Sequence, residues 1–186
     1  VRLSFSSDDV KVLRSSWWDD PWLEVLGHEP GEINMVRLDT GSAPALLGHD
    51  TYSRDSHVGK VVKAWVKDGR AYADVQISKR VECDGVWQDI VDGILSNVSV
   101  GYSVDERTLV LQTEGAPNEY RVTKWTPMEI SFVPIAADFT VGVGRSADTQ
   151  QQHYRVTDLP NTSTEDTTMP NETVTPAPAA TPAADD

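Results

Sequence analysis

The chain has 186 residues, enough for one domain and a tail, and a formal net charge of −13 that disfavours free nucleic acid and anionic membranes as partners. Its single cysteine, Cys83, excludes an intramolecular disulfide and a cysteine-built zinc site. No apolar run is long enough to span a membrane and the start lacks a secretory pattern, so we expect neither a transmembrane segment nor a signal peptide.

The first part of the chain predicts short strands joined by turns. Alternating apolar residues indicate strands near residues 1–5, 10–14 and 22–26. The clustered tryptophans Trp17, Trp18 and Trp22 are typical either of stacking on sugars or bases or of a packed corner of the core. We expect core packing, because no basic residues interleave with them.

Two histidines follow in very different settings. His28 lies in an irregular Gly/Pro loop and is expected to be solvated. His49 stands at the tip of an apolar strand end, Ala45-Leu-Leu-Gly-His-Asp50, where it is either a satisfied surface residue or a chemical group.

The middle of the chain carries the clearest local signal. Asp68-Gly lies between two alternating β-branched runs, residues 58–66 and 71–77, and predicts a tight hairpin. Apolar residues at helical spacing then predict an amphipathic helix over residues 84–95, packed on the core with Asp84 as its N-cap. Cys83 is given no role.

The stretch Asp92-Gly-Ile-Leu-Ser-Asn-Val-Ser-Val-Gly-Tyr102 marks a change of period from helix to strand. It contains Ser96 and, between two valines on a strand that should be buried, Ser99. A buried hydroxyl needs a hydrogen-bond partner. Ser99 is therefore either a core serine bonded to backbone or a nucleophile whose base lies elsewhere in the chain.

Further strands are predicted to residue 133, with a break at Pro127. In Met128-Glu-Ile-Ser-Phe-Val133, Glu129 lies within an apolar strand and is expected to be either on a solvated face or paired with a group such as a histidine. After Arg155 the sequence has no aromatic residue, lysine or arginine. We therefore expect a folded domain at 1–145 and a disordered acidic Thr/Pro/Ala-rich tail at 146–186.

Several of these motifs, in this order, resemble those of the prohead maturation serine proteases of tailed bacteriophages and, more distantly, the herpesvirus assemblins. The resemblance covers roughly residues 10–140. It rests on Trp22-Leu-Glu-Val-Leu-Gly-His-Glu-Pro-Gly31, Leu46-Leu-Gly-His-Asp50, Val58-Gly-Lys-Val61, Asp68-Gly69, Leu95-Ser-Asn-Val-Ser-Val-Gly-Tyr102 and Met128-Glu-Ile-Ser-Phe-Val-Pro134.

The resemblance implies a mainly β fold, an assemblin-like antiparallel β-barrel with a few surrounding helices. It implies a catalytic triad of Ser99 as nucleophile, His49 as general base and Glu129 as orienting acid. Where the assemblins have a paired-arginine loop, this chain has Ile135-Ala-Ala-Asp138, so backbone N–H groups of that loop are the expected oxyanion donors. No cofactor and no metal are expected.

The implied function is a serine endopeptidase that cleaves scaffold, the N-terminal segment of the major capsid protein and itself during procapsid maturation. It would act in the bacterial host cytoplasm, inside the assembling procapsid. The family logic also suggests a homodimer or higher oligomer. The alternative is a non-catalytic β-barrel capsid-assembly or scaffold module. A third hypothesis is a carbohydrate-binding module that uses the tryptophan cluster.

Overall fold

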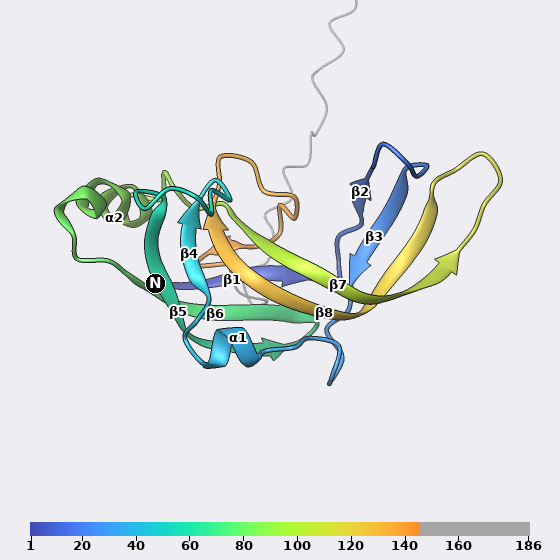
Figure 1. Ribbon diagram of the computed structural model, residues 1–186, viewed down its shortest axis with the longest axis horizontal. Coiled ribbons are helices and arrows are strands. Elements are labelled where there is room, and N and C mark those ends of the chain that lie inside the picture. Colours follow the sequence, from blue (N-terminus) through green and yellow to red (C-terminus); the bar gives the residue numbers. More distant parts are fainter. Residues whose placement is uncertain (146–186) are drawn as a thin grey trace, which may run out of the picture. The chain divides into compact units, whose positions relative to one another are not determined.

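The computed structural model describes residues 1–145, which are mainly β-structure (Figure 1). The strands are β1 (Arg2–Ser7), β2 (Val12–Arg14), β3 (Trp22–Leu26), β4 (Pro44–Leu47), β5 (His57–Lys67), β6 (Arg70–Ile77), β7 (Val98–Leu111), β8 (Asn118–Phe132) and β9 (Gly142–Val143). The helices are α1 (Val36–Asp39) and α2 (Asp84–Val91), with a 3₁₀ turn over Val81–Cys83. The predicted tail lies outside the described residues.

The described strands form one mixed sheet in the order β2-β3-β8-β4-β5-β6-β1-β9, and β7 pairs with β8 beside this path. The pairs β3–β8 and β4–β8 are parallel, and the others are antiparallel. The mainly β prediction is confirmed. The sheet is not closed, so the predicted barrel is not confirmed, and the expectation of purely antiparallel pairing is wrong for two strand pairs.

The predicted hairpin is confirmed as β5 and β6. Asp68 and Gly69 have φ values of 51° and 70°. Two successive positive φ values are what a two-residue hairpin turn needs to match the twist of its strands. Gly59, near the start of β5, is required for another reason, because a Cβ there would lie 2.3 Å from the Gln76 carbonyl oxygen of β6.

The long strand β8 runs through the centre of the sheet (Figure 1). The predicted break at Pro127 does not occur, because the register with β7 shifts between Gly101 and Tyr102 and Pro127 falls at that bulge. A missing N–H is tolerated at such a position. The side chains of Ile130 and Phe132 enter the core, together with Trp125, which is fully buried.

Helix α2 differs from its prediction. It is shorter than residues 84–95, its N-cap is Cys83 rather than Asp84, and no side chain caps it. Ile90 is its buried residue, whereas Trp87 and Val91 are about half exposed. The apolar spacing correctly predicted a helix, but most of that apolar face stays in contact with solvent.

Candidate functional site

The strands β7 and β8 place four small or polar residues on one face of the sheet. Ser99 pairs with Ser131 and Gly101 pairs with Glu129 in an antiparallel register. Residues two apart on a strand share a face, and so do directly opposed residues. Ser99, Gly101, Glu129 and Ser131 therefore point to the same side.

His49 reaches this face from β4, which pairs with the edge of β8 opposite to β7. Strand β4 pairs in parallel with β8, with Leu46 beside Ser131, and the chain then turns at Gly48 and His49, whose φ values are 61° and 60°. Positive φ is uncommon for a non-glycine residue. The backbone N–H of His49 donates to Ser131 Oγ at 3.1 Å, which holds the turn against β8.

The side chains of His49 and Glu129 are directly bonded, with 2.6 Å between Nδ1 and Oε1. Ser131 Oγ donates to the other carboxylate oxygen at 2.5 Å. Glu129 is buried, and 42% of the His49 side chain is exposed. Because the Glu129 carboxylate can only accept a hydrogen bond, His49 Nδ1 must carry the proton that it donates. In the neutral ring, Nε2 is then free of a proton and can accept a hydrogen bond. Of the two alternatives for Glu129, pairing with a histidine is confirmed.

Gly101 makes this arrangement possible. A Cβ at this position would lie 2.3 Å from Glu129 Oε1 and 3.0 Å from its Cδ. Such contacts are far inside van der Waals distance, so the glycine provides the space in which the buried carboxylate lies. The sequence showed a glycine close after Ser99, but only the register shows which side chain needs it.

Ser99 lines a cavity of about 490 Å³ together with His49. Over residues 1–145, however, the structure shows no hydrogen bond between Ser99 Oγ and a ring nitrogen of His49. The structure therefore brings Glu129 to His49 and puts Ser99 into the same cavity without the predicted Ser99–His49 bond. Ser96, the other serine of the motif, lies just before β7, where its carbonyl accepts from the N–H of Val143.

A second polar cluster in the cavity was not predicted. Arg14 of β2, Glu24 of β3 and Tyr102 of β7 all line it. Arg14 Nε donates to Glu24 Oε1 at 3.0 Å, and the Tyr102 hydroxyl also donates to Glu24. Burial raises the pKa of Tyr102 well above its ordinary value, and the hydrogen bond to Glu24 is the second largest cause of this increase. Nothing in the local sequence links these residues, because they come from three separate strands.

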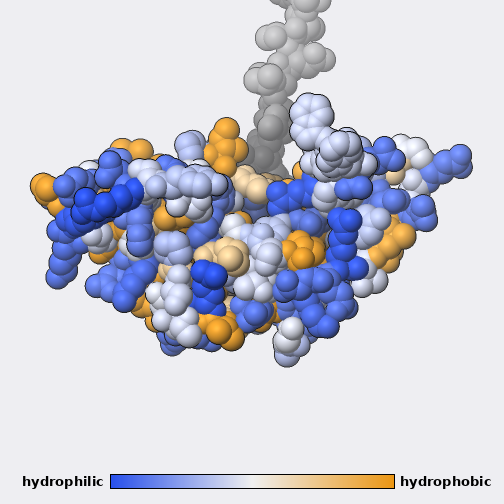
Figure 2. Space-filling view, in the orientation of Figure 1, coloured by the Kyte–Doolittle hydropathy of each residue, from blue (hydrophilic) through white to orange (hydrophobic). Residues whose placement is uncertain are grey.

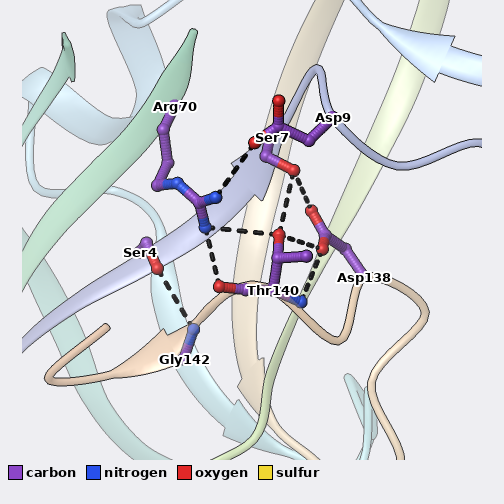
Figure 3. A network of polar contacts seen from close by, with 7 residues as sticks. All are labelled: Ser4, Ser7, Asp9, Arg70, Asp138, Thr140 and Gly142. Carbon is purple, nitrogen blue, oxygen red and sulfur yellow. Dashed lines mark hydrogen bonds and ion pairs between the residues drawn. The ribbon is translucent and has the colours of Figure 1, made fainter. Parts of the chain in front are cut away.

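Ser7, Ile135, Ala137 and Asp138 also line the cavity. Figure 3 shows how Asp138 accepts from Ser7 Oγ and Thr140 Oγ1, both at 2.6 Å, while Arg70 donates to the Thr140 carbonyl at 2.7 Å and to Asp9 at 3.2 Å. This network fastens the segment before β9 to β1 and β6. The loop expected to supply oxyanion donors thus brings the carboxylate of Asp138 to the cavity wall.

Two predictions outside the cavity are wrong. His28 is buried rather than solvated: its Nε2 lies 2.8 Å from Ser6 Oγ, its Nδ1 lies 3.0 Å from the Leu26 carbonyl, and burial lowers its pKa below the ordinary value of 6.5. Trp17 and Trp18 do not pack in the core, because they are 98% and 94% exposed. Neither difference has a local sequence signal.

Among the described residues, no group of three or more His, Cys, Asp or Glu side chains is arranged to hold a metal ion. The helices found between residues 1 and 145 are too short or too polar to cross a membrane.

Comparison with known proteins gives one informative match. The chain is 46% identical over 127 residues, 68% of its length, to a protein named major capsid protein from Halomonas phage phiHAP-1. The match covers 21% of that relative, so the chain spans about a fifth of its length. No family model matches the chain. No solved structure matches it either.

This match corrects the identification as a prohead protease. The relative bears the name of a structural capsid protein, not of a peptidase. The predictions of a serine endopeptidase, of hydrolytic activity and of protease terms for the chain are therefore wrong, whereas the capsid and bacteriophage terms fit the match. The roles assigned to Ser99, His49 and Glu129 are not tested by the match or by the structure.

Proposed function

We propose that residues 1–145 form a non-catalytic, mainly β module of a phage capsid protein or of a capsid-assembly factor. The observation that carries the proposal is the 46% identity over 127 residues to a protein named major capsid protein. Its partners would be the major capsid protein and a scaffold protein or segment, and its location the procapsid assembling in the bacterial host cytoplasm.

In this proposal, Ser99, His49 and Glu129 belong to a site that binds a segment of capsid polypeptide. The cavity has apolar walls, such as Phe5, Val98 and Val100, and a few polar groups, a combination typical of binding sites. The Glu129 carboxylate is occupied by His49 and Ser131. Within the described part of the chain, the Ser99 hydroxyl and His49 Nε2 form no hydrogen bond, so both can bond to a bound segment.

The test is co-expression of the chain with the shell protein of the same phage, followed by sedimentation of the particles and intact-mass measurement. We expect the chain to sediment with the particles and the shell protein to keep its full encoded mass. The Ser99→Ala variant should leave that mass unchanged, as should Ser96→Ala, the matched control outside the cavity. A shortened shell protein that returns to full length only with Ser99→Ala would overturn the proposal, and so would particles without the chain.

A further inference from the structure

The turn between β2 and β3 presents two tryptophans to solvent. Trp17 and Trp18 are 98% and 94% exposed. Ser16 Oγ accepts from the backbone N–H of Trp18 at 3.2 Å and of Asp19 at 2.9 Å, so the turn has a defined shape. Scattered exposed apolar residues need no explanation. Two adjacent indoles on an ordered turn are different, because tryptophan is enriched among the anchors of protein interfaces and an ordered turn lowers the entropy lost on binding.

The end of β7 that reaches this region, where Arg107 lies over the Trp22 ring, is also uncovered. We call outer sheet the part formed by β2, β3, residues 118–124 of β8 and residues 103–111 of β7, which Figure 1 shows at one end of the sheet. Every β7 residue from 103 to 111 is exposed. The exposed large apolar side chains of the outer sheet, at 41–61% exposure, are Leu13, Val104, Leu109, Val110 and Leu111. Hydrophobic (orange) residues are visible at this end in Figure 2.

Strand β7 also has an open edge. Residues 103–111 of β7 pair with β8 alone, which leaves one strand edge without a backbone partner in the described structure. An uncovered face and an open edge that carry apolar side chains indicate a protein contact.

Charge complementarity favours a second copy of this chain as the partner. Asp19 and Asp20 on the tryptophan turn have no cation within ion-pair distance in residues 1–145. The Arg107 guanidinium lies 5.1 Å from the Trp22 ring centre and 4.7 Å from that of Tyr120, and it too is without an ion pair in this part of the chain. One copy thus carries unmatched charges of both signs on its outer sheet, and a second copy presents the matching set.

We infer that a second copy of this chain docks on the outer sheet, with Trp17 and Trp18 of each copy against β7 of the other and Asp19 and Asp20 facing Arg107. Two indoles bury about 150–250 Å² each, roughly half of the ~800 Å² that each partner contributes to a stable interface. The exposed side chains of β7 supply further area. This inference is independent of the proposed capsid role, since the purified chain alone tests it.

The experiment is sedimentation equilibrium of the full 186-residue chain between about 1 and 200 μM. We expect a monomer–dimer equilibrium that the double variant W17S/W18S weakens at least tenfold. These side chains are exposed, so circular dichroism should show an unchanged fold. Ile94→Ser, a matched change at an exposed apolar residue just after α2, should leave dimerisation unchanged.

Charge-reversal variants test whether Asp19 and Asp20 of one copy face Arg107 of the other. R107E alone and D19K/D20K alone should each weaken dimerisation, because every contact then joins like charges. Mixing the two variants should restore it, because opposite charges face each other again at both contacts of the mixed dimer. A monomer at every concentration, a dimer indifferent to W17S/W18S, a mixture no stronger than its components, or binding of a monomer to uncharged vesicles through the tryptophans would each overturn the inference.

Discussion

Replacing Gly101 with alanine tests whether the buried Glu129 carboxylate needs the space that this glycine leaves. The added Cβ would lie 2.3 Å from Glu129 Oε1, so the carboxylate must move away from His49 and Ser131 or the strands must separate. Overpacking costs about 1–3 kcal/mol, and a weakened hydrogen bond to a charged group costs about 1.5–3 kcal/mol. Because one movement can relieve part of the clash, we expect a total loss of about 2–4 kcal/mol.

Urea denaturation measures this loss directly, and a thermal melt should show a decrease of roughly 5–15 °C. Gly85→Ala is the control, because a Cβ there meets nothing within 4 Å and the residue lies in α2, where alanine is favoured over glycine. The same Gly101→Ala change in a Glu129→Ala background should cost far less, because the clashing carboxylate is gone. A neutral Gly101→Ala variant, or an equal cost in both backgrounds, would refute the reasoning.

Three further predictions concern other buried contacts. The unfolded chain protonates His28 near pH 6.5, and the folded chain does so only at lower pH. The stability that neutral His28 contributes is therefore present above about pH 6.5 and is lost as the pH falls through the folded pKa, with a slope of at most about 1.4 kcal/mol per pH unit. When urea midpoints are plotted against pH, His28→Gln should show a smaller decrease on the acid side than the wild type. Trp125→Phe removes the 2.8 Å bond from Nε1 to the Gly27 carbonyl and should cost about 1–3 kcal/mol in a thermal melt, and an unchanged melting temperature would count against it. Asp138→Ala deprives Ser7 and Thr140 of their acceptor, so hydrogen exchange should accelerate over residues 138–142 and not in β5, and protection equal to wild type would contradict the role given to this network.

The resemblance to prohead proteases shows what a set of short motifs can and cannot establish. The structure does place Glu129 against His49, and the catalytic roles proposed for the two residues stay predictions. The resemblance led to the wrong activity, because the activity was carried over from a family rather than derived from the bonds of the site. The name of the relative overturned that activity, and the structure does not test the roles proposed for Ser99, His49 and Glu129.

The sequence by itself determined the features that depend on neighbours along the chain. Alternation predicted β1, β2 and β3, and Asp68-Gly69 predicted the hairpin. These features are local, since a period of two residues or a positive φ value is set by adjacent residues.

Only the tertiary structure decided which side chains are covered and which groups meet. His28 is buried because Ser6 and Trp125 arrive from distant parts of the chain. Trp17 is exposed because no element within residues 1–145 lies over its turn. Arg14, Glu24 and Tyr102 meet because the fold brings β2, β3 and β7 to the wall of one cavity. Burial and pairing depend on strand order and register, which join residues far apart in sequence and leave no local pattern.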